Sequence, residues 1–295
     1  MMPAGGLRAR VAAQLDRMLG SADLDARGPR ASVMIAANYR HGARTPARER
    51  LWSGMAERYL ARQSAVIREG RAALLTAGVP GAGKSSVVSQ LGLVDEGWRR
   101  LDADVVKDYL LEDLVVTGRV EDLLVRELAD AHPVMPAELA SLVHLESVAF
   151  IDELRTDCLA RGENVVIEGT LSWPPAAQHL LDELVQREYR EVRIVDVEVP
   201  RVVAHEQALA RWWAGRQDGI AGRGGGGLFV PAGAIDHAFT DPGNRRSVCA
   251  ANVRAAFDSP PARALPVLTL TVYDSTGAAA ITETQERRLG VLQPR

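Results

Sequence analysis

The chain has 295 residues, of which 47% are hydrophobic and 25% are charged, and its formal net charge is −3 at pH 7. This composition is typical of a globular protein, and the small net charge gives no general attraction to nucleic acid or to anionic membranes. No apolar run approaches the roughly 20 residues of a membrane-spanning helix, and charges interrupt the N-terminal apolar stretch. We therefore expect a cytoplasmic protein with no membrane partner.

The first 70 residues contain two segments with helical spacing of apolar residues, 7–19 and about 47–69, joined by a polar loop region. Apolar residues that recur every three or four positions are typical of a helix with one buried face. We expect residues 1–70 to form an N-terminal helical extension, and the sequence assigns it no role.

From residue 71 onward, short apolar segments alternate with helical patterns. The segments expected to be strands are 71–78, 98–104, 164–170, 191–199 and 266–274. Short buried strands that alternate with helices indicate a parallel sheet with helices on both faces. We therefore predict a single α/β domain over residues 71–275, followed by a charged helical tail over residues 276–295.

Two further segments are expected to modify this α/β domain. Residues 105–131 and 137–162 both have helical patterns, and Pro133 separates them, so a helical insertion is expected at about 105–150. Residues 215–231 are dense in glycine and carry arginine. A flexible loop with charges of this kind can close over a nucleotide, so we predict a glycine-rich lid here.

The segment GVPGAGKSS satisfies the pattern G-x-x-x-x-G-K-[ST] between an expected strand and an expected helix. Lysine occurs only at positions 84 and 107, so a chain that strongly favours arginine has a lysine in this loop. Lys84 would reach the β- and γ-phosphates of ATP, and the Ser85 hydroxyl would bind Mg²⁺. The residues predicted to bind ATP are Gly78, Val79, Pro80, Gly81, Ala82, Gly83, Lys84, Ser85 and Ser86.

Acidic residues follow the next two expected strands. Asp102 and Asp104 are two positions apart in LDADVVK and point in opposite directions if the strand continues, so one of them could face the phosphate loop. A carboxylate there would accept the proton of an acceptor hydroxyl. Glu168 ends the strand NVVIEGT, at the sheet edge where ligands gather in α/β proteins. The alternative for Asp102 and Asp104 is a solvated pair at the end of a strand. The alternative for Glu168 is an acid that caps a helix or lies in a turn.

These motifs, in this order and spacing, resemble the zeta toxin family of kinases over about residues 71–275. The family consists of bacterial toxin–antitoxin phosphotransferases related to chloramphenicol phosphotransferase. The resemblance implies a P-loop kinase-like fold, ATP and Mg²⁺ as cofactors, and an antitoxin protein as a possible partner. It also implies a small-molecule substrate, UDP-N-acetylglucosamine, which would be phosphorylated at the 3′-hydroxyl of its amino sugar.

The resemblance also implies individual roles at the catalytic centre. Lys84 and Ser85 match the lysine and the hydroxyl of the family's phosphate loop, and Asp104 matches its catalytic base. We expect Asp102 to have a structural or supporting role at the substrate. Glu168 and Thr170 match the Glu-Gly-Thr of the family's acceptor site.

A phosphate clamp is implied by arginines on a later helix and in the loop that follows it. Arg211 and Arg223 fit this pattern best, and Arg216 is the fallback. The alternative is that these residues are ordinary surface arginines, since the chain has many arginines.

An acid on the helix before the third strand is implied to hold the sugar nucleotide. Glu146 interrupts the apolar stripe of that helix, and a carboxylate there is costly unless it is paired or contacts a ligand. Asp152 and Glu153 lie closer to the strand and compete for this role.

The acceptor pocket departs from the family pattern, because Ser172 stands where members often carry an arginine. Alternatives are therefore a kinase of another hydroxylated metabolite, such as a nucleotide cofactor or an antibiotic, and a polynucleotide 5′-kinase. The latter would need a basic channel with stacking aromatics, but aromatic residues make up only 5% of the chain. A nucleotide-gated binding module would leave the acids after the second strand without a role.

Overall fold

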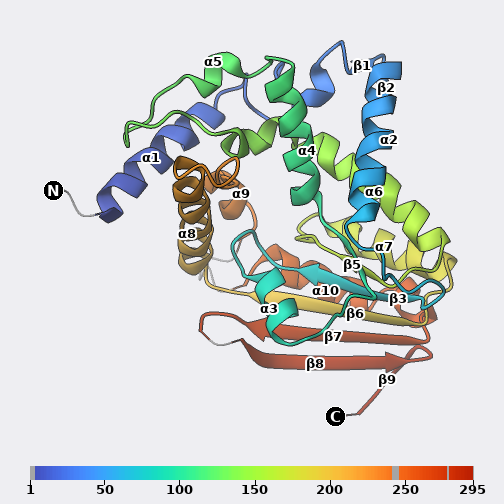
Figure 1. Ribbon diagram of the computed structural model, residues 1–295. Helices are drawn as coiled ribbons and strands as arrows, with labels where there is room; N and C mark the ends of the chain where they lie inside the picture. Colours follow the sequence, from blue (N-terminus) through green and yellow to red (C-terminus); the bar gives the residue numbers. More distant parts are fainter. Residues whose placement is uncertain (1–3, 241–245, 278, 295) are drawn as a thin grey trace. The chain divides into compact units, whose positions relative to one another are not determined.

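The computed structural model describes residues 4–240, 246–277 and 279–294 (Figure 1). Its contacts divide the chain into two compact units, each assembled from segments that are distant in sequence. The first, here called the helical unit, consists of Met1–Arg62, Ala103–Asp152 and Ala208–Ala232. The second, here called the sheet unit, consists of Gln63–Asp102, Glu153–Gln207 and Gly233–Arg295.

The sheet unit is built on a sheet whose strand order is β4-β5-β3-β6-β7-β8-β9. The strands β4, β5, β3, β6 and β7 pair in parallel, whereas β8 and β9 are antiparallel to their neighbours. The bounds are β3 Ala72–Ala77, β4 Arg99–Leu101, β5 Val165–Ile167, β6 Glu191–Glu198, β7 Val267–Asp274, β8 Ala280–Arg288 and β9 Val291–Leu292. The predicted mostly parallel α/β fold is confirmed.

Burial explains why β3 is the central parallel strand. Its sequence AALLTA has no charged residue, and Leu74 and Leu75, which face opposite sides of the sheet, are both fully buried. Helices α3 (Lys84–Gln90) and α10 (Val248–Phe257) pack against β6, and α7 (Pro174–Gln186) packs against α10 and α11 (Pro260–Ala264). Strands covered on both faces lack the alternation of polar and apolar residues, as the sequence indicated.

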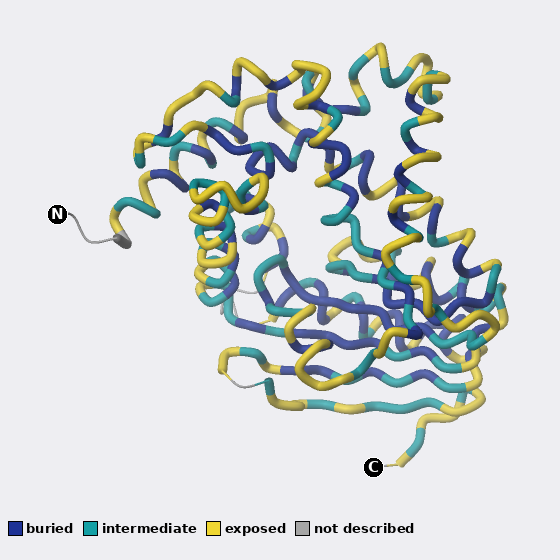
Figure 2. The backbone as a smooth tube through the Cα atoms, in the orientation of Figure 1, coloured by how far each residue is buried: buried dark blue, intermediate teal, exposed yellow. Residues whose placement is uncertain are grey.

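The predicted C-terminal helix over residues 276–295 is wrong, because residues 280–288 form β8 along the exposed edge of β7. The charged sequence of β8 suggested a solvated helix, but charged side chains also suit a strand near a sheet edge, where they discourage pairing with other chains. Figure 2 shows β8 mainly in teal and yellow, in contrast to the dark blue of the strands at the centre of the sheet.

The helical unit contains most of the remaining helices, including those of the first 62 residues. Its elements are α1 Ala4–Leu19, η1 Ser32–Met34, β1 Tyr39–Arg40, β2 Ala43–Arg44, α2 Pro46–Ala61, α4 Ala103–Val116, α5 Glu121–Leu124 and η2 Pro136–Val143. The helices α6 (His144–Ala160) and α8 (Arg201–Ile220) continue from one unit's segment into the other's, and α9 is Ala232–Asp236. The helix expected over 137–162 is therefore divided at His144 into η2 and α6.

The glycine-rich segment 215–231 is only partly a loop. Helix α8 continues through Gly215 and Gly219 to Ile220, so the expectation of a loop over the whole segment is wrong. A Cβ atom on Gly227 would lie 2.2 Å from the carbonyl oxygen of Trp212. The glycines therefore allow the returning chain to pack closely on α8, a contact that larger residues would prevent.

None of the helices in the described part of the chain combines the length and the apolar character needed to cross a membrane.

Candidate functional site

The loop between β3 and α3 has the backbone that its glycines predicted. Gly78, Gly81 and Gly83 have φ angles of +124°, +85° and +84°. A Cβ atom on Gly78 would also lie 2.3 Å from the carbonyl oxygen of Val197. Residues other than glycine would strain this turn, a backbone conformation that can present N–H groups to a phosphate.

Lys84 folds back over this loop. Its Nζ donates hydrogen bonds to the carbonyl oxygens of Gly78 at 2.9 Å and Val79 at 3.1 Å. The ammonium group is thus held above the loop by backbone oxygens, which a phosphate group can replace without leaving a buried charge unpaired.

A chain of polar contacts joins the phosphate loop to the two neighbouring strands. The Ser85 hydroxyl donates to Glu168 Oε2 at 2.8 Å, and Arg100 Nη1 donates to Glu168 Oε1 at 3.1 Å. Ser85 lies at the start of α3, Glu168 directly follows β5, and Arg100 is the middle residue of β4. The contact between Ser85 and Glu168 follows from the parallel strands, whose carboxyl ends meet at one edge of the sheet.

The Glu-Gly-Thr segment is also bonded to the phosphate loop and to β3. The Gly78 N–H donates to the Thr170 carbonyl oxygen at 3.2 Å, and the Gly169 N–H donates to the Thr76 hydroxyl at 3.1 Å. The Thr170 and Ser172 hydroxyls lie 2.9 Å apart. The structure therefore brings together four predicted positions from two distant sequence segments: Lys84, Ser85, Glu168 and Thr170.

The predicted catalytic acid lies at the start of a helix. Asp102 ends its segment of the sheet unit, and Asp104 is in the first turn of α4 in the helical unit. The Lys107 ammonium donates to Asp104 Oδ1 at 2.7 Å. Burial lowers the pKa of His144, and the positive charge of Lys107 lowers it further. The role of Asp104 as the base stays a prediction.

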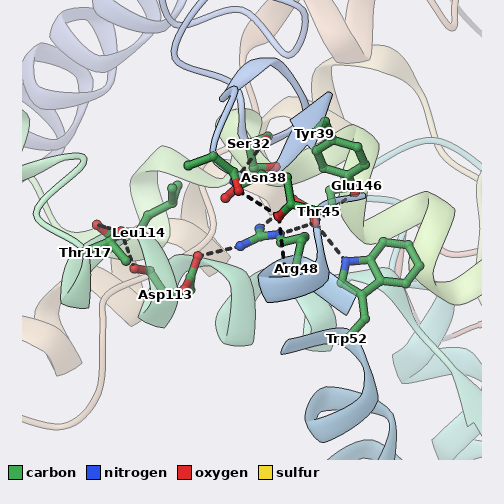
Figure 3. A network of polar contacts seen from close by, with 11 residues as sticks. Ser32, Asn38, Tyr39, Thr45, Arg48, Trp52, Asp113, Leu114, Thr117 and Glu146 are labelled. Atoms are coloured by element: carbon green, nitrogen blue, oxygen red, sulfur yellow. Dashed lines mark hydrogen bonds and ion pairs between the residues drawn. The ribbon is translucent and has the colours of Figure 1, made fainter. Parts of the chain in front are cut away.

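Glu146 lies in a buried network of the helical unit (Figure 3). Its side chain is 0% exposed, and it accepts hydrogen bonds from Arg48 Nε and Nη2 at 2.6 Å each, from Trp52 Nε1 at 2.9 Å and from the Tyr39 hydroxyl at 3.0 Å. Arg48 Nη1 also donates to Asp113 Oδ2 at 2.6 Å. Burial raises the pKa of Glu146, but the hydrogen bonds and charge of Arg48 outweigh this and leave it below its ordinary value.

A substrate could reach the Glu146 carboxylate only by displacing protein donors, so the geometry gives this residue a structural part. The sequence predicts that Glu146 needs a partner, but its pattern did not lead to Arg48 as that partner. Arg48 lies one helical turn before Trp52 on α2, and both residues are buried. An arginine within an apolar stripe was the available signal.

The predicted clamp arginines differ in their surroundings within the helical unit. Arg216, the fallback, is 0% exposed and donates to the carboxylates of Asp130 and Glu138 at 2.8–2.9 Å, so it is part of a buried structural network. Arg223 is 67% exposed and pairs with Asp218, and Arg211 is exposed on α8. The clamp roles of Arg211 and Arg223 stay predictions.

One buried acid in the sheet unit, Asp196, was not among the predicted site residues. Asp196 on β6 is fully buried, and its carboxylate oxygens accept no hydrogen bond from the described residues. Burial raises the pKa of Asp196 to about 8, and the neighbouring Glu198 and Glu283 raise it while Arg254 opposes them. This shift favours the neutral carboxyl group, which lowers the cost of burying it.

Comparison with known proteins identifies the fold. Residues 74–218 match the family model described as an AAA domain. The chain has a P-loop kinase fold. A chain from the PezAT chromosomal toxin–antitoxin system of Streptococcus pneumoniae is similar, with 15% identity, a TM-score of 0.51, and coverage of 82% of this chain and 81% of that chain. The resemblance to the zeta toxin family is thereby confirmed at the level of the fold.

Two further similarities extend the comparison. A chain in the structure of AvrRxo1-ORF1:-ORF2 with ATP is 13% identical, with a TM-score of 0.56, and the match covers 85% of this chain and 70% of that chain. The protein called calmodulin calcium-dependent NAD kinase from Arabidopsis thaliana is 31% identical over 118 residues, which are 37% of this chain. The matched segment spans only 20% of that protein's length.

Proposed function

We propose that this protein is an ATP- and Mg²⁺-dependent kinase that transfers the γ-phosphate of ATP to a hydroxyl group of a small molecule. The observation that carries the proposal is the meeting of Lys84, Ser85 and Glu168 beside a glycine loop with left-handed backbone. A loop that only turned the chain would need neither the lysine nor the carboxylate.

The residues of the sheet unit fit the two cofactors. The glycines leave room for a phosphate against the backbone N–H groups, and the Lys84 ammonium can exchange two carbonyl oxygens for phosphate oxygens. The Ser85 hydroxyl and the Glu168 carboxylate are oxygen donors, which Mg²⁺ prefers. A bound Mg²⁺ would neutralise charge that develops on the transferring phosphate.

Other residues predicted from the sequence would supply the remaining catalytic groups. Asp104 would accept the proton of the acceptor hydroxyl, Asp102 would support it at the substrate, and Thr170 would orient the acceptor with Glu168. Arg211 and Arg223 would contact the transferring phosphate and stabilise its charge. Loss of either arginine should lower turnover more than nucleotide affinity.

For the acceptor, we propose a UDP-amino sugar, UDP-N-acetylglucosamine first, and a toxin role with a neutralising antitoxin protein. The order of the motifs supports this substrate class. Support for the toxin role is the toxin–antitoxin system named for one structure of the same fold. Ser172 argues that the acceptor contacts differ from those of familiar family members, because a serine lacks the bidentate grip of an arginine on phosphate.

A nucleotide cofactor such as NAD is the second candidate acceptor. The observation that favours it is the 31% identity, over 118 residues, with a plant protein named as an NAD kinase. Both candidates carry two linked phosphates and hydroxylated sugars, so one pocket chemistry could serve either.

The test offers the protein ATP and Mg²⁺ with one acceptor at a time: UDP-N-acetylglucosamine, NAD, or an oligonucleotide with a 5′-hydroxyl. We expect mass spectrometry to find one added phosphate on UDP-N-acetylglucosamine, and none with the Lys84→Ala variant. Phosphate on NAD alone would favour the second candidate, and phosphate on the oligonucleotide would overturn both. If ATP is consumed only with a metabolite extract, the kinase proposal stands and these acceptors do not.

A further inference from the structure

Arg100 is a charged residue in the middle of β4. It contacts Glu168, the acid that also accepts a hydrogen bond from Ser85 beside the phosphate loop. We propose that Arg100 is a positioning residue, which holds one oxygen of Glu168 so that the other faces Ser85. This inference rests on the proposed function, since it assigns a residue to the same magnesium and phosphate site. Neither the motif pattern nor the similarity to known proteins assigns Arg100 a role.

The strand register places the two side chains together. Arg100 on β4 pairs with Val166 on β5, and Glu168 lies two residues farther along the same chain. Residues two apart on a strand lie on one face, so Arg100 and Glu168 project on the same side of the sheet. The Glu168 N–H also donates to the Leu101 carbonyl oxygen at 3.0 Å, which continues the pairing up to the acid.

The two oxygens of Glu168 have different partners. Oε1 accepts from Arg100 Nη1 at 3.1 Å, and Oε2 accepts from the Ser85 hydroxyl at 2.8 Å. With Oε1 held, rotation of the carboxylate is restricted, and Oε2 stays directed at the hydroxyl expected to bind Mg²⁺. The guanidinium also balances the charge of Glu168, which would otherwise repel the phosphates of a nucleotide bound beside it.

The neighbouring Arg99 shows what a structural arginine of the same strand looks like. Arg99 is buried and donates to Glu163, which is also buried, so this pair belongs to the interior. The Arg100 side chain is 35% exposed and that of Glu168 is 12% exposed. Ion pairs with an exposed partner contribute little to stability, so the fold does not require Arg100 in the way it requires Arg99.

The experiment measures the Mg²⁺ concentration that gives half-maximal binding of a fluorescent ATP analogue, which needs no acceptor. Arg100→Ala should raise this concentration roughly tenfold or more, as expected when a residue that orients a metal ligand is lost. Arg100→Lys should recover part of the loss, because it keeps the charge without the fork geometry. In transfer assays, Arg100→Ala should lower kcat more than it changes KM for ATP.

A double-mutant cycle tests whether Arg100 acts through Glu168. In a Glu168→Gln background, Arg100→Ala should add almost nothing to the shift in Mg²⁺ dependence. Arg193→Ala is the matched control, because Arg193 forms a similar partly exposed pair with Glu191 on β6, and it should leave Mg²⁺ dependence unchanged. Thermal unfolding of all variants checks that they remain folded.

The outcomes separate this inference from the proposed function. Equal effects of Arg100→Ala in the wild-type and Glu168→Gln backgrounds, or an Arg193→Ala shift of the same size, would overturn the positioning role while leaving the kinase proposal intact. Binding of nucleotide with the expected cycle but no phosphate transfer would leave Arg100 in place and overturn the kinase proposal. A wild-type protein that binds no nucleotide would overturn both.

Discussion

Arginine–carboxylate pairs occur in both units, but they serve different ends. In the helical unit, Glu146 is fully buried and receives four hydrogen bonds from three side chains. In the sheet unit, Glu168 is partly exposed and is held by one arginine and one serine hydroxyl. A carboxylate whose acceptor capacity is used up inside the protein supports the fold, whereas one with spare capacity beside a phosphate loop can bind a ligand. Burial and donor number therefore distinguish the two roles.

Lys84→Ala should produce the largest loss of activity among changes in the sheet unit. Without the ammonium group the phosphates lose their main side-chain charge partner, so phosphate transfer should fall by roughly 10³ or more. The unfolding temperature should change little, because Lys84 is partly exposed and its ammonium group donates to backbone oxygens of its own loop. Transfer at the wild-type rate would refute the assignment of this loop.

Asp104→Asn should cause the second-largest loss of activity. The amide keeps the shape of the side chain but cannot accept a proton, so turnover should fall by roughly 10²–10⁴ while nucleotide binding persists. Asp102→Asn is the comparison variant and should have a smaller effect. If instead Asp102→Asn is inactive and Asp104→Asn is active, the base has been assigned to the wrong acid.

Glu146→Ala and Glu168→Ala test the contrast between the units directly. Loss of Glu146 leaves the buried guanidinium of Arg48 with fewer partners, which should reduce the free energy of unfolding by about 3–5 kcal/mol. Loss of Glu168 should leave stability within about 1 kcal/mol of wild type and should lower transfer instead. Chemical denaturation and transfer assays on both variants measure the split. A stable but inactive Glu146→Ala protein would return Glu146 to the substrate site.

Asp196 gives the smallest expected effect on phosphate transfer, because its loss should change only how stability depends on pH. Its folded-state pKa of about 8 lies above that of an unfolded aspartate, so between about pH 4 and pH 8 the folded protein holds more protons than the unfolded chain. Stability from this group is therefore lost as pH rises, by about 1.4 kcal/mol per pH unit at most.

Asp196→Asn should flatten this dependence and raise the unfolding temperature at pH 9 relative to wild type. Glu191→Gln, on an exposed position of the same strand, is the control and should leave the pH profile unchanged. Equal slopes for wild type and Asp196→Asn between pH 6 and pH 9 would show that Asp196 is not the titrating group.

Parts of the fold and of the site could be predicted because they depend on neighbours in the sequence. Glycines at three positions, a lysine and a serine follow a buried strand, and this local order is enough to specify a phosphate loop. The charged C-terminal segment could not be predicted in the same way. Its residues suit either a solvated helix or an edge strand, and the free edge of β7 decided between the two.

The sequence by itself determined the alternation of buried strands and helices, the phosphate loop, and the arrival of Glu168 at the same sheet edge, because the carboxyl ends of parallel strands lie at one edge of the sheet. Only the tertiary structure decided which charged side chains are paired with other side chains inside the protein. Arg48 and Glu146 are 98 positions apart in sequence, and a separation of this size does not indicate whether two residues are in contact. Their 2.6 Å hydrogen bonds form because the fold brings Arg48 beside Glu146, and this contact separates the structural acid Glu146 from the candidate ligand Glu168.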